Sequence, residues 1–208
     1  GLRLRRVSRA ALRRAMGVAS AARWLHDVRW VEKPAQPPAG SALEGQWLVC
    51  ADERGVGREV ATLLEAAGAR VTLAWRGDGL VPCDEGWRVD ALDPEQVRGM
   101  VVRAGGPGFA GLVCLWPLAA AGGAASLERL EGAHRELLGG VLHLAQAIAD
   151  AGTPLWLVTR GAQAVSGNVP DVAQAPVWGL GGVIAAELPA LRAVRIDLDP
   201  ANEATDAE

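Results

Sequence analysis

Residues 154–189 read PLWLVTRGAQAVSGNVPDVAQAPVWGLGGVIAAELP and decide the fold. The short apolar run over residues 155–159 has the length and composition of a strand that is buried on both faces of a parallel sheet. A polar, glycine-containing loop follows, and Pro176 then begins a helical pattern that ends near Glu187 and Pro189. The apolar positions of that helix are Val177, Trp178, Leu180, Val183 and Ile184. The stretch therefore predicts a strand, a loop and a helix.

The same alternation runs through most of the chain. Strands are predicted at residues 46–51, 71–75, 87–90, 111–116 and 194–198, in addition to the one above. Apolar stripes predict helices between them: Val56, Val60, Leu63, Leu64 and Ala67 in one, and Leu127, Leu130, Leu137, Leu138, Val141, Leu144 and Ile148 in another. Asp93-Pro94 and Ser126 are typical helix starts. We expect an α/β protein with a Rossmann-like, doubly wound parallel sheet.

Composition narrows the class of protein. The chain has 208 residues, half of them apolar, and a formal net charge of -3, which argues against nucleic-acid binding and against disorder. No apolar run reaches the length of a membrane span. The three cysteines, Cys50, Cys83 and Cys114, lack metal-ligand spacing, and two lie in predicted strands. We therefore expect reduced thiols in a cytoplasmic protein and no metal site.

The frame of the chain is similar to that of a short-chain dehydrogenase/reductase, but the catalytic residues differ. In such an enzyme the strand before the loop delivers a catalytic Ser, and the loop and helix carry a Tyr-x-x-x-Lys pair. Here the strand runs into Thr159-Arg160-Gly161-Ala162, the chain has no Tyr, and its only lysine is Lys33. The resemblance thus extends to the fold and not to the proton-transfer residues.

The first strand-to-helix turn departs from the nucleotide-binding pattern in the same way. It reads CADERGVG over residues 50–57, where a reductase has Thr-Gly-x-x-x-Gly-x-Gly to admit a pyrophosphate. Gly55 and Gly57 match, whereas Asp52 and Glu53 place negative charge near the phosphate position. The turn is interpreted either as a weak NADPH site or, the reading we favour, as an inherited turn that no longer binds nucleotide.

Residues near this turn are also compatible both with a weak NADPH site and with an inherited turn that no longer binds nucleotide. Arg76 follows the second strand, where an arginine accepts the 2′-phosphate of NADP, and with the phosphate turn altered we expect a surface role. Asp90 and Asp93 resemble the acidic turn beside an adenine pocket, but helix capping accounts for Asp93. His134 and His143 lie off the centre of the leucine stripe and are expected to be exposed or to face a partner.

Three segments carry a more specific resemblance. LWLVTRGAQAV (155–165), VAQAPVWGLGGVIAAELP (172–189) and RAVRIDLDP (192–200) resemble the structural, non-catalytic subdomain of the ketoreductase in modular type I polyketide synthases. The resemblance extends over residues 24–200. It implies that this chain is not itself an enzyme but packs on and stabilises the catalytic half, which reduces β-ketoacyl intermediates held on acyl carrier protein.

The resemblance also implies the cofactor and the partners. NADPH is expected in the catalytic subdomain, and no cofactor-binding, catalytic or metal-binding residue is expected in this chain. Expected partners are that catalytic subdomain, a dehydratase, an acyl carrier protein and, in modules that contain one, an enoylreductase. Neither nucleic acid nor membrane is expected to bind.

The ends of the chain suggest three segments. Residues 1–22 are rich in arginine and resemble the end of a dehydratase or a linker, residues 23–200 match the subdomain, and residues 201–208 form an acidic tail. Alternation over residues 23–30 predicts a strand with Trp24, Val28 and Trp30 on one side, a candidate face for the catalytic partner.

Two other classes of function remain open on sequence alone. Gly55-Val56-Gly57 is the support for an independently active NAD(P)- or S-adenosylmethionine-dependent enzyme with a nonstandard site. The arginine-rich start and the tryptophans, if exposed, are the support for a docking or scaffold domain unrelated to reduction.

Overall fold

The computed structural model describes residues 30–34, 43–106, 108–120, 126–165, 167 and 169–202. Its chain divides into two compact units, residues 1–37 and residues 38–208, and the fold below is that of the second unit. The predicted strand over residues 23–30 lies outside the described residues except for Trp30, which is not part of a strand. The predicted segment 1–22 also lies outside them, as do residues 203–208 of the predicted tail 201–208, whose first two residues belong to a 3-10 turn.

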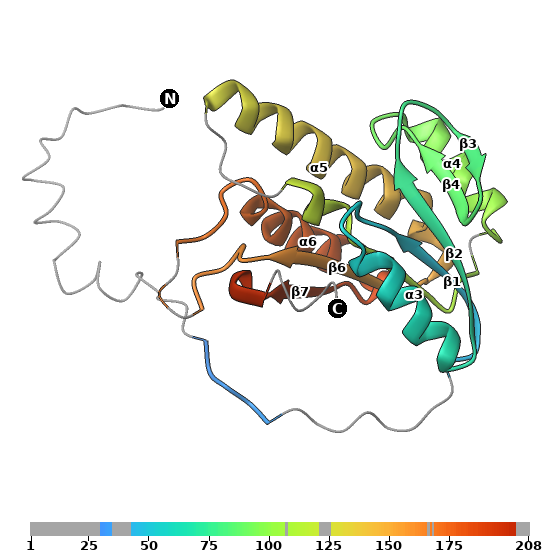
Figure 1. Ribbon diagram of the computed structural model, residues 1–208, viewed down its shortest axis with the longest axis horizontal. Coiled ribbons are helices and arrows are strands. Elements are labelled where there is room, and N and C mark those ends of the chain that lie inside the picture. The colour runs from blue at the N-terminus through green and yellow to red at the C-terminus, as the bar shows by residue number, and fades with distance from the viewer. Residues whose placement is uncertain are drawn as a thin grey trace, which may run out of the picture. The chain divides into compact units, whose positions relative to one another are not determined.

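The second unit is built on a seven-stranded sheet with the order β3-β4-β2-β1-β5-β6-β7 (Figure 1). The strands are β1 (Gly45–Cys50), β2 (Ala69–Arg76), β3 (Val81–Cys83), β4 (Gly86–Val89), β5 (Gly111–Cys114), β6 (Leu155–Arg160) and β7 (Val194–Leu198). All neighbours are parallel except β3 and β4. The predicted doubly wound sheet is confirmed, and its strand order reverses between β1 and β5.

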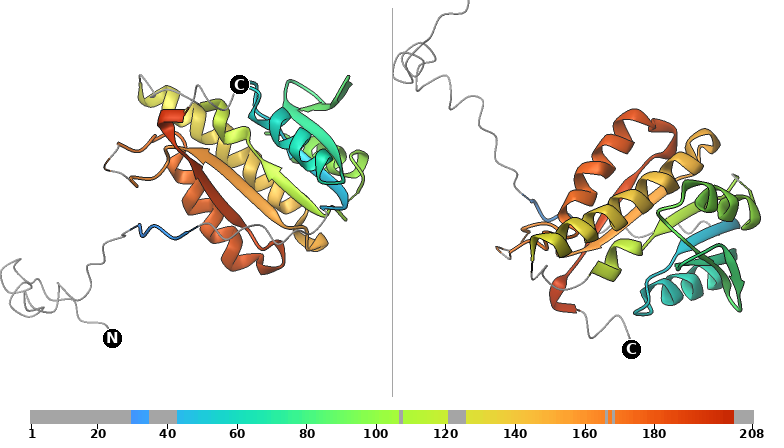
Figure 2. Two further views of the ribbon diagram at one scale, coloured as in Figure 1. Left: turned by 60° about the horizontal axis from the view of Figure 1, so that its bottom comes forward. Right: turned by 90° about the horizontal axis from the view of Figure 1, so that it is seen from above.

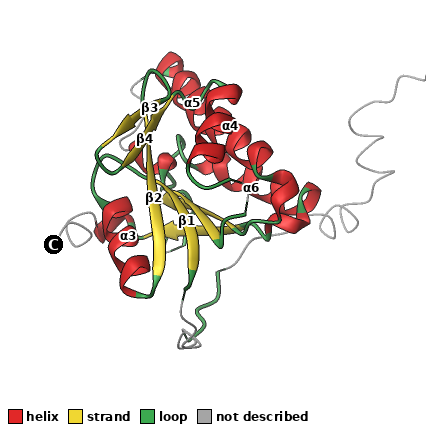
Figure 3. Ribbon diagram, turned by 90° about the vertical axis from the view of Figure 1, so that its right-hand side faces the viewer, coloured by secondary structure: helices red, strands yellow, loops and turns green. Residues whose placement is uncertain are grey.

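The helices form two unequal layers. They are α3 (Val56–Ala66), α4 (Pro94–Arg103), α5 (Leu127–Ala147) and α6 (Ala175–Glu187), with short 3-10 turns η1 (Trp116–Ala120), η2 (Ala149–Ala151), η3 (Pro189–Leu191) and η4 (Pro200–Asn202). Figure 3 shows α4, α5 and α6 on one face of the sheet and α3 on the other. The connection from β2 to β4 contains the antiparallel strand β3 in place of a helix.

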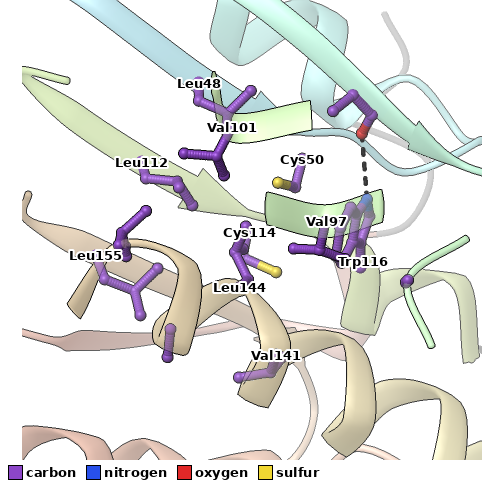
Figure 4. Packing of buried hydrophobic residues seen from close by; sticks show 14 of the residues in the cluster. Leu48, Cys50, Val97, Val101, Leu112, Cys114, Trp116, Val141, Leu144 and Leu155 are labelled. Atoms are coloured by element: carbon purple, nitrogen blue, oxygen red, sulfur yellow. Dashed lines mark hydrogen bonds between the residues drawn. The ribbon is translucent and has the colours of Figure 1, made fainter. Parts of the chain in front are cut away.

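Each face of the sheet has its own apolar core. The larger core joins Leu48, Cys50, Leu112 and Leu155 of the strands to α4, α5 and α6, and Figure 4 shows Val141 and Leu144 of α5 directed into it. The smaller core, on the α3 side, includes Trp47, Val49, Val113 and Val158. Alternate residues of β1 enter opposite cores, as the pleat of a strand buried on both faces requires.

Two tryptophans organise the smaller core. Trp47 of β1 and Trp156 of β6 stack across β5 with ring centroids 5.3 Å apart. Gly111 of β5 makes this possible, because a Cβ atom there would lie 2.4 Å from Trp47 Cζ3 and 2.6 Å from Trp156 Cζ3. Any other residue at this position would force the two rings away from the sheet.

The cysteines behave as core residues, as the sequence predicts for Cys50 and Cys114. All three are free thiols; Cys50 and Cys114 are fully buried neighbours on β1 and β5, and Cys83 is half-buried. Burial raises the pKa of the Cys50 thiol well above its usual value, and its hydrogen bond with the Cys114 thiol adds to the effect. Cys50 is therefore protonated and unreactive near neutral pH.

The predicted helix starts are confirmed. Asp93 caps α4 through Oδ1, which accepts hydrogen bonds from the backbone N–H groups of Glu95 and Gln96 at 2.9 and 3.2 Å, and Pro94 occupies the first turn. Ser126 Oγ accepts the N–H of Arg129 at 3.3 Å at the start of α5. These contacts satisfy donors that a helix cannot satisfy internally.

Two members of the predicted apolar stripes are wrong. Leu63 of α3 and Leu127 of α5 are each 70% exposed. In α3 the sheet contacts the face bearing Gly57, Ala61 and Leu64, and the first turns of α5 extend beyond the larger core. Helical periodicity predicted these helices correctly. It contains no information on how much of each helix lies over the sheet.

None of the helices in the described part of the chain combines the length and the apolar composition of a membrane span.

Leu144 provides a test of the larger core. It is fully buried, and Leu144→Ala should lower the free energy of unfolding by about 2–5 kcal/mol because it leaves a cavity. Leu142→Ala, on the same helix at a side chain 40% exposed, should cost less than about 1 kcal/mol. Urea denaturation followed by circular dichroism measures both, and equal losses would contradict the placement of α5.

The Asp93 cap provides a test by pH. The pKa of this carboxyl is lowered from 3.8, mainly by the Gln96 backbone N–H and then by the Gln96 side chain. A lowered folded-state pKa contributes stability above the unfolded value that disappears as the pH falls through the folded value. The stability difference between wild type and Asp93→Ala should therefore be present at pH 7 and shrink below about pH 4. A difference that persists unchanged at pH 2 would exclude the charged cap.

Candidate functional site

The crevice outside the carboxyl ends of β1 and β5 is the place where a doubly wound sheet binds its ligand. In this chain the crevice is bounded by the turn after β1, by the segment after β5 and by the start of α3. A nucleotide bound there would need free backbone donors at the turn and open space beside β5.

A carboxylate of the chain itself occupies the phosphate turn. Asp52 is 2% exposed, and its Oδ1 accepts the backbone N–H of Gly57, in the first turn of α3, at 2.7 Å. Its Oδ2 accepts the N–H of Arg54 at 2.8 Å. A helix N-terminus attracts anions through such N–H groups. Here Asp52 serves as that anion, so the Arg54 and Gly57 N–H groups are already bonded.

The two glycines of the turn have local structural roles. Gly55 precedes α3 with φ +108°, a conformation that other residues rarely adopt. A Cβ atom at Gly57 would lie 2.6 Å from the Cβ of Ala51, so this position needs glycine for α3 to approach β1. Backbone conformation at Gly55 and packing at Gly57 therefore explain both glycines that match the nucleotide-binding pattern.

The segment after β5 fills the crevice with bulky side chains. Trp116 and Leu118 of η1 are buried, and the Trp116 indole Nε1 donates a hydrogen bond to the carbonyl of Ala74 at 3.1 Å (Figure 4). Gly140 of α5 lies against this ring, because a Cβ atom there would be 3.3 Å from Trp116 Cε3. The end of β5 is thus part of the core rather than a wall of an open site.

A hollow lies beside the crevice, at the ends of β2 and β4. It measures about 430 Å3, and its charged lining consists of Glu53, Asp78, Asp90, Glu136 and Arg76. Arg76 does not stand free as a phosphate ligand, because its guanidinium pairs with Glu136 of α5 at 3.1 Å. Four carboxylates against one paired arginine disfavour a polyanionic ligand.

The junction between β6 and α6 is closed by a second internal carboxylate. Asp197 of β7 accepts the Thr159 hydroxyl at 2.7 Å, and its two oxygens accept the backbone N–H groups of Ala162 and Gln163 at 2.9 Å each. The Trp178 indole of α6 donates to the same Thr159 oxygen at 2.8 Å. The Thr159 hydroxyl is thus a fully engaged structural link between β6, β7 and α6.

The loop between β6 and α6 is held by similar contacts. Gln174 is buried, and its amide accepts the N–H of Arg160 and donates to Asp171, both at 2.9 Å. His134 of α5 is hydrogen-bonded through Nε2 to the carbonyl of Val172 at 2.9 Å. Side-chain amide, hydroxyl, imidazole and carboxylate groups, all hydrogen-bonded within the chain, therefore occupy the position where a short-chain reductase carries its reactive groups.

Several expectations about single residues can now be corrected. His134 and His143 are half-buried and bonded to backbone carbonyls, the latter to Ala91 at 3.0 Å, so neither is a free surface group. Among the described tryptophans, Trp47, Trp75 and Trp116 are buried and Trp87, Trp156 and Trp178 are half-buried, so of these residues only Trp30, at 44% exposure, fits the exposed tryptophans expected for a scaffold domain. Of the two acids in the phosphate turn, Glu53 lies at the surface and pairs with Arg88.

The sequence did not reveal the capping role of Asp52 or Asp197. An Asx turn at Asp52 was the available signal, since aspartate often bonds the N–H two residues ahead, as it does here with Arg54. No local pattern links Asp197 to Thr159, because 38 residues separate them. Among the described residues, no three His, Cys, Asp or Glu side chains gather as a metal-binding group.

Solved structures define the class of fold. The chain is similar to a short-chain dehydrogenase/reductase from Mycobacterium marinum, with a TM-score of 0.57, 23% identity and 73% of this chain and 72% of that chain covered. A structure of the adenylation, ketoreductase and pseudo-Asub domains of a keto acid-selecting NRPS module gives a TM-score of 0.72 at 16% identity, over 83% of this chain and 15% of that chain. The fold is that of a short-chain dehydrogenase/reductase.

The sequence matches identify the family. Residues 28–208 match the family described as the Rossmann fold domain of the polyketide synthase extender module SpnB, and the chain belongs to this family. It is 32% identical to the pikromycin polyketide synthase component PikAII of Streptomyces venezuelae over 84% of this chain, and 34% identical to the polyketide synthase GfsA of Streptomyces halstedii over 85%. The chain spans only about 4% and 2% of the lengths of these relatives.

Asp52 provides a test of the closed turn. Asp52→Ala leaves the N–H groups of Gly57 and Arg54 without their acceptor in a buried place and should lower the free energy of unfolding by about 1–3 kcal/mol. Glu53→Ala, next to it and exposed, should change stability by less than about 0.5 kcal/mol. Urea denaturation of the two variants measures the difference, and a neutral Asp52→Ala variant would refute the capping role.

Proposed function

We propose that this chain is the non-catalytic, structural half of a polyketide synthase ketoreductase. In this role it packs on and stabilises a catalytic half that binds NADPH and reduces β-ketoacyl intermediates on acyl carrier protein. Membership of the polyketide synthase family supports the assignment of this chain to a synthase module. The neighbouring dehydratase, acyl carrier protein and, where present, enoylreductase domains would belong to the same polypeptide.

The proposal rests on one observation. Carboxylates of the chain itself occupy both the turn where a reductase binds its nucleotide and the loop after β6 where a reductase carries catalytic residues. Asp52 takes the donors at the start of α3, and Asp197 takes the donors that follow β6. Catalysis by a reductase requires a hydride donor held at the first place and a proton donor at the second. The Asp52 and Asp197 carboxylates already bind backbone N–H groups at both places, and we infer from this that the fold serves a structural purpose.

We propose on the same grounds that the chain binds no NADPH. A pyrophosphate at the turn would have to displace a buried carboxylate that is already hydrogen-bonded, and would face the acidic hollow beside it. Removing one anion to admit another gains little, because the same N–H groups are shared between them. The NADPH of the module is therefore assigned to the catalytic half.

The alternative of an independently active NAD(P)- or S-adenosylmethionine-dependent enzyme loses its support from Gly55 and Gly57. Both residues are needed by the local backbone and by the packing of α3 against β1, whether or not a nucleotide binds. No separate observation in the described part of the chain favours that reading.

An experiment on the intact synthase module tests the structural role. Leu144→Ala and Asp52→Ala should each lower the melting temperature and the yield of folded module, because both weaken the fold of this domain. The rate of β-ketothioester reduction per folded module should stay within about twofold of wild type, since no residue of this chain takes part in the chemistry. A loss of turnover with unchanged melting temperature would contradict the proposal.

A further inference from the structure

Within the described part of the chain, one face of the sheet has no covering helix at its β7 end. Helix α3 packs on β1 and β2, and both views in Figure 2 place it away from β7. The main contacts of β7 are with β6 and with α6, which covers the opposite face of the sheet. Among the described residues, no strand pairs with the outer edge of β7.

The uncovered surface is apolar. In the parallel register Trp156 lies beside Val194, Val158 beside Ile196 and Arg160 beside Leu198, so alternate residues of β7 continue the smaller core. Val194 and Ile196 are 43% and 39% exposed, and Trp156 and Leu198 are half-buried. We call this surface the β7 face, and it consists of Trp156, Val194, Ile196 and Leu198.

The charged residues of β7 do not protect this face. Arg195 contacts α6, where its guanidinium lies over the Trp178 ring at 5.2 Å, and Asp197 binds Thr159 and the loop after β6. Soluble proteins usually guard an exposed edge strand with an outward lysine, a proline or a bulge. The absence of such a device among the described residues of β7, next to an apolar face, is typical of a permanent interface.

The length of related proteins indicates where the partner resides. The matched short-chain dehydrogenase/reductase structures are covered over 70–76% of their own chains, so about a quarter of such a subunit has no counterpart here. The synthase relatives extend far beyond the matched region, which is 2–4% of their lengths. A further strand and an apolar segment for the β7 face are therefore to be sought in the same long polypeptide.

We propose that the β7 face is the surface on which the catalytic half of the ketoreductase docks, with an extended apolar segment adding to the open edge of β7. The inference rests on the proposed function, because it takes the catalytic half as the partner. The free N–H and C=O groups of the edge would bind the backbone of the added strand. Its alternate apolar side chains would cover Val194 and Ile196 and would reach toward the Trp47–Trp156 stack beside them.

A photo-crosslinking experiment on the intact module tests the location and the partner together. The photoreactive residue p-benzoylphenylalanine replaces Ile196 in one variant and Leu63, exposed on α3, in the control variant. The Ile196 variant should crosslink to peptides of the catalytic half, as identified by mass spectrometry, and the Leu63 variant should not. Crosslinks from position 196 to a second copy of this chain or to another domain would overturn the proposal.

Hydrogen exchange in the unmodified module supplies an independent readout. The backbone amides of residues 194–198 should exchange on the order of tenfold or more slowly than those of an uncovered edge strand, for which β3 at the other end of the sheet is the internal reference. Fast exchange together with no crosslink would overturn the docking surface. If the Leu144→Ala and Asp52→Ala modules still behaved as a structural role requires, the proposed function would survive that result.

Discussion

The bond from the Gly57 N–H to the Asp52 carboxylate at the start of α3 is the constraint on which the rest of the functional interpretation depends. A parallel sheet that reverses its strand order creates a crevice lined by backbone donors, and those donors need acceptors. In a nucleotide-binding protein the ligand supplies them. In this chain Asp52 supplies them from within, so the fold is complete at this edge without a nucleotide.

The same solution recurs at the junction of β6 and α6. Asp197 satisfies the two N–H groups that follow β6 and fixes the hydroxyl of Thr159, while Trp116 and Leu118 fill the space beyond β5. Each replacement converts a place for a ligand or a reacting group into part of the core or of a hydrogen-bond network. Together they explain how a reductase frame persists in a domain that we assign to support rather than to catalysis.

Sequence reasoning predicted the fold well because the parallel strands are continuous apolar runs and the helix starts carry local capping signals. The six strands predicted within residues 46–198 overlap the observed strands, and Asp93 and Ser126 begin helices as predicted, although β5 ends at Cys114 and the predicted strand residue Trp116 belongs to η1. It missed β3, a three-residue strand containing Pro82, because so short a segment has no periodicity. It also interpreted Asp52 only as a repelling charge, since its partner Gly57 is identified by geometry and not by composition. The Asp197 network, which joins distant parts of the chain, was beyond any local pattern.

Titration of the isolated chain with NADPH by isothermal calorimetry or nicotinamide fluorescence tests the central claim, that the carboxyl edge is closed by the chain's own groups. We expect no saturable binding at NADPH concentrations up to about a millimolar, because the buried Asp52 carboxylate already accepts the Arg54 and Gly57 N–H groups of the turn. Saturable binding with a micromolar Kd would show that Asp52 can be displaced and would contradict the account.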